Sequence, residues 1–382
     1  MNQPSSSRCD QAPVQAREKV PATYRAGVVG LGWMGLLSDL GKRPPDRYEI
    51  DDVERPTPEL DVHRRFHFHE GSGAVEVPHS WAEVIWQRPE VELVAAAERD
   101  VGRLAIFRER YGIDAVYEDA GRMLRDQDLD IVAIATNTAG RAALTCLAAE
   151  CGVRAIAVEK PLAHTLAEAD RMVETCARAS IPLLAGAVPM NHPSYAVARE
   201  LVNGGAIGEP LAVEADSPHA QKPHWALFVD EPPAWAVGTG DCPRRESGSD
   251  EFAGQGMVTT ESGLVIFFRP GAGPARVTGS SGALAFDNGW RLWKDAEGDS
   301  RYRREVAWTG IQFAGGYNAV FGLSELIDCL EGRSSEPRSS GRRVAMAMEV
   351  EIALKLSASQ GGERTDLPLA DRSLGLNYDW FR

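Results

Sequence analysis

The chain has 382 residues, of which 43% are hydrophobic and 25% charged, and its net charge is −14. This length exceeds what one hydrophobic core usually needs, so we expect two domains. No stretch has the length and apolarity of a membrane-spanning helix, and the acidic balance argues against binding nucleic acid through its phosphates. We expect neither a membrane nor a nucleic acid as a partner.

The segment 1–25 is polar and rich in Pro and Ser, without the apolar core of a signal peptide. We expect a disordered tail and a cytoplasmic protein. The six cysteines are scattered without a metal-binding spacing, so we expect reduced thiols and no metal site.

Apolar strands alternate with helices in the first part of the chain. The strands are predicted at 26–29, 93–97, 131–135 and 154–158. Gly112 and Gly152 follow two of the intervening helices, as glycine commonly does at a helix C-terminus. The alternation predicts an α/β domain over 26–161, with a parallel sheet and helices on both faces.

From residue 211 the strands follow one another closely, separated by turns instead of helices. This spacing predicts one large, open, mostly antiparallel sheet. Two helices are expected after it, at 319–330 and 342–357. We therefore expect a second domain of the α+β class over 162–382.

A G-x-G-x-x-G motif comes directly after the first strand. In a Rossmann domain such glycines allow a tight turn, a close approach of the backbone to a pyrophosphate, and contact between helix and strand. The motif predicts a dinucleotide-binding loop; a glycine-rich turn without a ligand is the alternative. The predicted binding residues of this loop are Gly30, Gly32, Trp33, Met34 and Gly35.

The acidic residue that binds a ribose usually follows this motif by about 20 residues. Glu98 follows Gly35 by 63 residues, and the 43 residues at 36–78, which fit neither helix nor buried strand, account for the excess. The segment from His79 onward is typical of the helix expected after Gly35. We therefore predict an insertion at 36–78 that lies at the mouth of the active site, because the N-terminus of this helix faces the cofactor.

Two residues after the second strand bear on the choice of coenzyme. Glu98 would accept hydrogen bonds from both ribose hydroxyls and repel a 2′-phosphate, which favours NAD. Arg99 could accommodate that phosphate, so NADP stays open. A solvated strand end is the alternative for Glu98.

These residues, together with Thr136-Asn137 after the third strand and Glu159-Lys160-Pro161 after the fourth, resemble the glucose–fructose oxidoreductase, inositol dehydrogenase and MocA family. The Glu-Lys-Pro tripeptide is the most specific element of the resemblance, which covers nearly the whole chain after the tail. It implies a Rossmann domain and a second domain whose open sheet often forms homodimers or homotetramers. It also implies an NAD(P)-dependent oxidoreductase that transfers a hydride between nicotinamide and a sugar, cyclitol or similar polyhydroxylated molecule.

The resemblance also implies roles for single residues. Lys160 matches the family's active-site lysine, a cation that stabilises or relays the proton as the hydride moves. Glu159 is expected near the nicotinamide, and Thr136 and Asn137 are expected to border the cofactor. A surface lysine in a loop is the alternative for Lys160.

The family's histidine motif, D-x-G-x-H-x-x-D, has no clear counterpart in this chain. The nearest segment runs from Asp216 to Trp225 and is compressed. We choose His219 as the catalytic histidine, because the segment at 230–235 follows it at about the expected distance, and His224 is the rival. The family's Arg-x-x-Pro is replaced by Met-Asn-His-Pro at 190–193.

Further residues are candidate substrate contacts. His67 and His69 alternate in an extended segment of the insertion and would share one side of it. A metal site or a plain surface are the alternatives there, and packing is the alternative for the aromatic residues. The candidates are His63, His67, His192, His224 and Trp225.

Two other functions stay open. Some relatives keep NAD bound and use transient oxidation to cleave a glycosidic bond. The fold also occurs in ligand-responsive regulators without catalysis, which the degraded histidine motif favours and the intact Lys160 disfavours.

Overall fold

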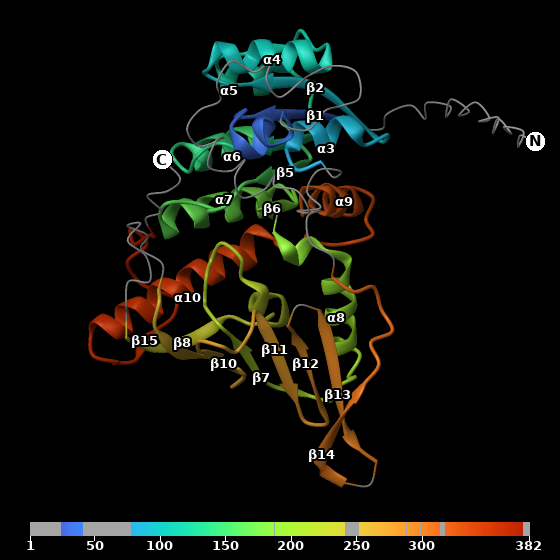
Figure 1. Ribbon diagram of the computed structural model, residues 1–382. Helices are drawn as coiled ribbons and strands as arrows, with labels where there is room; N and C mark the ends of the chain where they lie inside the picture. The colour runs from blue at the N-terminus through green and yellow to red at the C-terminus, as the bar shows by residue number, and fades with distance from the viewer. Residues whose placement is uncertain are drawn as a thin grey trace, which may run out of the picture.

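The computed structural model describes residues 24–40, 78–186, 188–240, 252–287, 289–297, 299–313 and 318–376. Within these residues the strands form two sheets, one of six strands and one of nine. Figure 1 shows the six-stranded sheet and its helices above the nine-stranded sheet, with a long helix between them. The expected division into a parallel and a mostly antiparallel part is confirmed.

The first sheet is parallel throughout, in the order β3-β2-β1-β4-β5-β6. Strands β1 and β4 are neighbours although two other strands lie between them in the chain, so the strand order reverses there. In open α/β sheets, ligands bind outside the carboxyl ends of the strands at such a point. The strands are β1 Tyr24–Val29, β2 Val91–Ala97, β3 Val116–Tyr117, β4 Ile131–Ile134, β5 Ala155–Val158 and β6 Leu183–Ala185.

This sheet extends past residue 161, where the sequence places the end of the first domain. Strand β6 pairs with β5 in parallel, and helix α7, Leu166–Arg178, connects the two. The four strands predicted for this domain from the sequence do not include β6. Its three strand residues are buried because helices cover both faces of a parallel sheet.

The helices between these strands begin and end at residues that satisfy their terminal groups. The Asp100 side chain accepts hydrogen bonds from the amides of Gly102 and Arg103 at the start of α4. The expected C-terminal glycine is confirmed, since Gly112 has a left-handed backbone with φ of 68°. The other helices here are α4 Val101–Tyr111, α5 Ala120–Asp126 and α6 Arg141–Glu150.

After the glycine motif, the described residues form helix on both sides of the segment 41–77. The part before this segment comprises η1, Trp33–Leu37, and α1, Ser38–Leu40, and the part after it is α3, Trp81–Gln87. Placing the start of the insertion at Leu36 is wrong, because Leu36 and the residues up to Leu40 are helical and buried in the core. Most of the expected insertion, at 41–77, lies outside the described residues.

Asp39 joins the two parts of the interrupted helix. Its carboxylate accepts hydrogen bonds from the backbone amides of His79, at 3.0 Å, and Ser80, at 2.5 Å. Ser80 then begins α3, accepting a hydrogen bond from the amide of Glu83. One carboxylate thus aligns α3 with the helix that starts at the glycine motif.

The second sheet has the order β14-β13-β12-β11-β7-β10-β9-β8-β15, and only β7 and β10 pair in parallel among the described strands. The expected mostly antiparallel sheet is confirmed. The strands are β7 Pro210–Ala215, β8 Pro233–Thr239, β9 Gln255–Thr260, β10 Val265–Phe268, β11 Ala275–Gly279, β12 Gly282–Phe286, β13 Trp290–Ala296, β14 Asp299–Val306 and β15 Thr365–Asp366.

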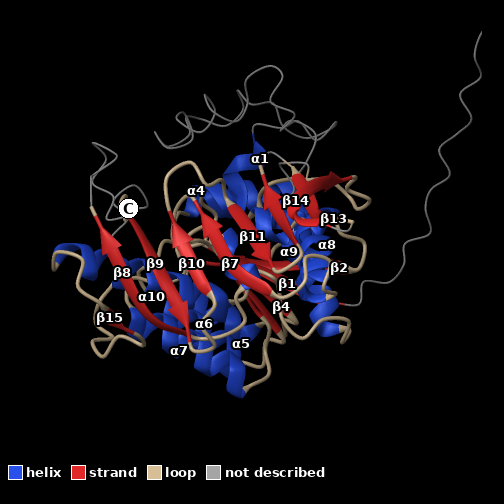
Figure 2. Ribbon diagram, turned by 90° about the horizontal axis from the view of Figure 1, so that it is seen from below, coloured by secondary structure: helices blue, strands red, loops and turns tan. Residues whose placement is uncertain are grey.

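Helix α10, Gly341–Ser359, lies between the two sheets (Figure 1). A Cβ atom at Gly238 of β8 would lie 2.2 Å from the backbone oxygen of Leu354, so the strand reaches this helix only because it carries glycine there. Figure 2 shows that none of the described helices covers the opposite face of the second sheet. Helices α8, Pro193–Asn203, and α9, Asn318–Leu330, complete the arrangement.

No helix in the described part of the chain is both long enough and apolar enough to cross a bilayer.

Candidate coenzyme and catalytic site

Most of the residues predicted to bind the coenzyme lie in loops at one edge of the first sheet. The glycine motif follows β1, Glu98 follows β2, Thr136 follows β4, and Glu159 and Lys160 follow β5. These four strands are neighbours and parallel, so their carboxyl ends lie side by side. The fold therefore brings together residues that are as much as 130 positions apart in the sequence.

The three motif glycines have different reasons to be glycine. Gly30 has a φ of 87°, and a Cβ at Gly35 would lie 1.8 Å from the backbone oxygen of Gly30. The protein itself therefore excludes side chains at both positions. Among the described residues, a Cβ at Gly32 would meet only the Arg103 guanidinium, at 3.9 Å. No other described atom crowds this position, which is what the close approach of a pyrophosphate requires.

The Glu98 carboxylate is tied to the glycine loop. One oxygen accepts a hydrogen bond from the Leu31 amide at 2.7 Å, and the other accepts from the Arg99 amide at 2.7 Å. The Arg103 guanidinium lies 3.8 Å from it, while the Arg99 side chain is exposed. Glu98 is thus positioned between the phosphate loop and the place expected for a ribose, with two cations nearby.

The Glu159 carboxylate is buried, with 4% of the residue exposed. It accepts a hydrogen bond from the indole N–H of Trp81 at 2.9 Å, and its other oxygen accepts from the Lys160 amide at 3.2 Å. Trp81 is the first residue of α3, which continues the interrupted helix. Glu159 therefore connects that helix to the loop that carries Lys160, whose side chain is half-buried.

Arg141, at the start of α6, was not singled out from the sequence. Its guanidinium is buried and donates hydrogen bonds to the carbonyl oxygens of Thr136, Glu159 and Pro161. Burial lowers the pKa of this guanidinium to about 10, and the charge of Glu159 opposes that change. Arg141 stays charged at neutral pH and joins the two loops that carry the predicted site residues.

Thr136 and Asn137 lie at the same edge. The Thr136 hydroxyl donates to the carbonyl oxygen of Asn137 at 2.9 Å, and the Asn137 residue is exposed. Their position beside β1 agrees with residues that border a bound dinucleotide.

His219 lies in the loop after β7 and its side chain is 37% exposed. Its Nδ1 atom is 4.0 Å from a carboxylate oxygen of Glu351, which is fully buried in α10. Glu351 accepts hydrogen bonds from the amides of Ala220, at 2.8 Å, and Phe252, at 3.0 Å. An accessible imidazole beside a fixed carboxylate is an arrangement suited to proton transfer.

His224, the rival histidine, lies in an aromatic cluster. Its Nδ1 atom shares a 2.6 Å hydrogen bond with the hydroxyl of Tyr195, and its ring stacks near that of Phe286 with an interplanar angle of 14°. Burial, assisted by the charge of Lys222, lowers the pKa of His224 to about 4. His224 is therefore neutral at pH 7 and has one nitrogen already engaged.

His192 and Trp225 were candidate substrate contacts, but both are buried, with 3% and 1% of the residue exposed. His192 begins α8, where its Nδ1 atom accepts a hydrogen bond from the Ser194 amide at 3.1 Å. The Trp225 indole donates to the carbonyl oxygen of Pro218 at 3.1 Å and packs against Phe268. Neither side chain is accessible to a substrate in this structure, and both are explained by packing.

The remaining two candidates, His63 and His67, lie outside the described residues. Within the described ranges, no group of three or more His, Cys, Asp or Glu side chains is arranged to hold a metal ion.

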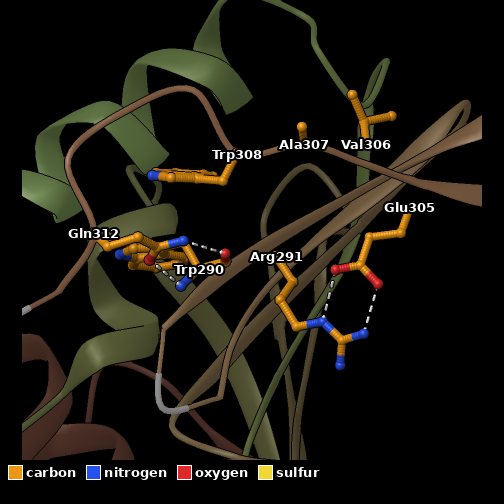
Figure 3. A pocket seen from close by; sticks show the side chains of 7 residues that line it. All are labelled: Trp290, Arg291, Glu305, Val306, Ala307, Trp308 and Gln312. Carbon is orange, nitrogen blue, oxygen red and sulfur yellow. Dashed lines mark hydrogen bonds and ion pairs between the residues drawn. The ribbon is translucent and has the colours of Figure 1, made fainter.

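A cavity of about 520 Å³ lies on the second domain (Figure 3). The indoles of Trp290 and Trp308 are nearly parallel, with centroids 6.0 Å apart, and Arg291 pairs with Glu305 at its rim. None of the predicted site residues lines it, so it is not the coenzyme site. The lining residues are Trp290, Arg291, Glu305, Val306, Ala307, Trp308 and Gln312.

Part of the chain is similar to known sequences. Residues 71–186 match the model of an oxidoreductase family with an NAD-binding Rossmann fold, named for glucose–fructose oxidoreductase, inositol dehydrogenase and MocA. D-apiose dehydrogenase of Paraburkholderia graminis is 37% identical over 133 residues, which are 35% of this chain and 34% of that protein. Myo-inositol 2-dehydrogenase of Thermotoga maritima is 28% identical over 149 residues, which are 38% of this chain and 43% of that protein.

Comparison with solved structures extends the likeness of fold to both domains. An oxidoreductase from Agrobacterium radiobacter, solved with NAD+, L-tartaric acid and magnesium, matches 90% of this chain and 98% of its own with a TM-score of 0.59 and 18% identity. The sequence matches span only about a third to two fifths of the curated relatives' lengths. The likeness in sequence is therefore concentrated in the first domain, whereas the likeness in fold covers both.

Proposed function

We propose that the protein is an NAD-dependent dehydrogenase or reductase of the glucose–fructose oxidoreductase, inositol dehydrogenase and MocA family, whose model matches residues 71–186. Its substrate is a sugar, cyclitol or similar polyhydroxylated molecule. The proposal draws on the names of the relatives, which act on apiose and inositols.

The observation that carries coenzyme binding is the open backbone at Gly32. The protein crowds the positions of Gly30 and Gly35, while among the described residues a Cβ at Gly32 would meet only the Arg103 guanidinium, at 3.9 Å. Amides at the start of the helix and the nearby guanidinium suit an anionic pyrophosphate. Glu98 would accept the ribose hydroxyls, which favours NAD over NADP.

We assign proton transfer to and from the substrate to Lys160 and His219. When bound, the nicotinamide donates or accepts the hydride. Lys160 lies beyond the end of β5 and supplies a positive charge and a proton at the reacting oxygen of the substrate. His219 is favoured over His224 because it is accessible and lies beside Glu351, whereas His224 is neutral, largely buried and bound to Tyr195.

We further propose a cytoplasmic protein that assembles into homodimers or homotetramers through the second sheet. The support is the sheet face without a covering helix (Figure 2), where Phe267 of β10 is 39% exposed between two buried strand residues. Light scattering gives the oligomeric state, and exchanging Phe267 for Glu should dissociate the assembly if this face forms it.

Turnover tests the catalytic proposal. A panel of sugars and cyclitols is offered with NAD and NADP, and absorbance of the reduced nicotinamide is followed. For a converted substrate, Lys160→Met should keep NAD affinity within a few-fold and lose roughly 10²–10³ in turnover. His219→Ala should lose a comparable or smaller factor, and His224→Ala should retain most activity.

Four results would contradict this assignment. Equal turnover by wild type and Lys160→Met would remove the proton relay. A His224→Ala loss larger than that of His219→Ala would reverse the assignment of the histidine. A wild type that binds NAD and ligand without ever changing the oxidation state of the nicotinamide would favour the regulator, and tightly copurifying NAD with glycoside cleavage would favour the redox-assisted cleaving enzyme.

A further inference from the structure

The backbone of the loop that carries Lys160 accepts hydrogen bonds from a single buried side chain, that of Arg141. Glu159 precedes Lys160 and Pro161 follows it, and the carbonyl oxygens of both accept hydrogen bonds from the guanidinium of Arg141. The same guanidinium donates to the carbonyl oxygen of Thr136, in the loop after the neighbouring strand β4. The backbone is therefore fixed on both sides of Lys160 and tied to the next loop of the site.

We propose that Arg141 is a positioning residue for Lys160, holding the backbone of the 159–161 loop so that the lysine ammonium meets the reacting oxygen in one direction. The inference rests on the proposed function of Lys160. It concerns a residue that contacts neither coenzyme nor substrate and acts only through the loop.

The chemistry of the side chain fits this role. Three acceptors in different directions require a donor with several N–H groups in a rigid plane, and a guanidinium has five. A lysine carries its donors on one nitrogen and cannot reach acceptors spread around a plane. Arg141 is therefore not replaceable by another cation at this position.

The burial of Arg141 implies a purpose other than stability. Only 1% of the residue is exposed, and Glu159, whose charge interacts with it, is itself 4% exposed. Removing such charges from water costs much of what their attraction contributes, so buried ionic groups are weak stabilisers. What the arrangement does provide is a single geometry for the loop, because every alternative would leave buried carbonyl oxygens unpaired.

The side of Lys160 next to β6 is restricted as well. Gly186 has a φ of 86°, and a Cβ added there would lie 3.5 Å from the Cβ of Lys160 and 3.0 Å from a methyl group of Val188. Backbone thus packs beside Lys160 where a side chain would otherwise stand. The Lys160 loop is thus held by the Arg141 contacts and packs beside the residue that follows β6.

Arg141→Lys and Arg110→Lys form a matched pair of variants. Arg110 is also buried, with 3% exposed, and donates from two nitrogens to Glu83 at 3.1 and 3.0 Å. It lies at the end of α4, and because α4 returns from the carboxyl end of β2, Arg110 is near the opposite edge of the sheet. Both variants keep the charge and lose the planar donor group, but only one contacts the Lys160 loop.

The experiment reads the position of Lys160 directly. The chain has six lysines, so reductive methylation with ¹³C-formaldehyde gives few NMR signals. The signal that is missing from the Lys160→Arg variant belongs to Lys160. Arg141→Lys should shift or broaden this signal and lower kcat about 10- to 100-fold, because a displaced catalytic group loses rate steeply. The Kd for NAD and the KM values should stay within about threefold, which a general loss of structure would not allow.

The control decides between positioning and stability. Arg110→Lys should lower the urea midpoint comparably while leaving the Lys160 signal and kcat unchanged. An Arg141→Lys protein with an unchanged Lys160 signal and kcat within twofold of wild type would overturn the proposal, as would equal losses in Arg110→Lys. If Arg141→Lys does not fold, Arg141→Gln takes its place under the same criteria. If wild type converts no hydroxylated substrate, the proposed function fails, and the NMR signal alone then decides the positioning.

Discussion

Trp81 donates its indole N–H to a carboxylate oxygen of Glu159 across 2.9 Å, although the two residues are 78 positions apart. The bond joins the helix that resumes after the 41–77 segment to the loop before Lys160. The start of α3 is held separately by the Asp39 carboxylate, which accepts hydrogen bonds from the amides of His79 and Ser80.

Trp81→Phe should therefore lower the free energy of unfolding. The change removes the N–H from a buried carboxylate, and a hydrogen bond to a charged group is worth about 1.5–3 kcal/mol. Trp86→Phe, on the same helix and 46% exposed, should cost less than about 0.5 kcal/mol. Urea unfolding followed by circular dichroism measures both. Equal midpoints would mean that the bond to Glu159 contributes nothing.

Gly32→Val should separate coenzyme binding from folding. The open space at Gly32 accommodates a side chain in the free protein but places it where a pyrophosphate must approach, so NAD affinity should fall at least about tenfold. The melting temperature should stay within a few degrees of wild type. Calorimetric titration with NAD and a thermal scan provide the two readings.

The control for that variant is Gly35→Ala. Its Cβ would lie 1.8 Å from the backbone oxygen of Gly30, so it should melt well below Gly32→Val with or without coenzyme. Unchanged NAD affinity in Gly32→Val would remove the dinucleotide site from this loop.

Glu98→Ser should relax the preference for NAD over NADP. The variant loses the carboxylate that would repel a 2′-phosphate. It keeps two arginines that could bind this phosphate: Arg99, and Arg103, whose guanidinium lies 3.8 Å from the Glu98 carboxylate in the native protein. Loss of the bond to the Leu31 amide should also cost about 1 kcal/mol of stability. The ratio of kcat/KM for the two coenzymes is the measurement.

Glu98→Gln supplies the comparison, because it keeps the length of the side chain and an acceptor for a ribose hydroxyl but no charge. It should show a smaller change toward NADP with little loss of NAD binding. A wild type that already prefers NADP would refute the role assigned to Glu98.

His224→Gln should reduce the loss of unfolding free energy that the protein shows as the pH falls below 7. Burial lowers the pKa of His224 from 6.5 to about 4, so between these values the unfolded chain binds a proton that the folded protein does not. Stability is then fully present above pH 6.5 and is lost as the pH falls toward 4. Wild type should lose about 2 kcal/mol through this group between pH 7 and pH 5.

The measurement is urea unfolding of wild type and His224→Gln at both pH values. Glutamine does not titrate, so the difference between the two proteins should shrink by about that amount at pH 5. A difference that is the same at pH 5 and pH 7 would show that His224 is not a buried neutral imidazole.

Local patterns in the sequence were sufficient for most of the elements and for most of the proposed coenzyme site. Apolar runs of strand length predict β1, β2, β4 and β5, and each is followed directly by residues of the site. Because parallel strands align their carboxyl ends, the order of the motifs along the chain already implies that Gly32, Glu98 and Lys160 meet. The spacing between Gly35 and Glu98 likewise revealed an interruption, although not that the helix runs on through Leu40.

Only the tertiary structure decided which side chains support these motifs. Arg141, Trp81 and Glu351 have no signature of their own, because an arginine, a tryptophan and a glutamate on amphipathic helices look like any surface or core residue. Their roles depend on partners far away in the chain, and a hydrogen bond across 78 residues leaves no local trace. The same holds for the two histidines: His219 and His224 are alike in sequence, and packing alone makes one accessible beside a carboxylate and the other a largely buried neutral partner of Tyr195.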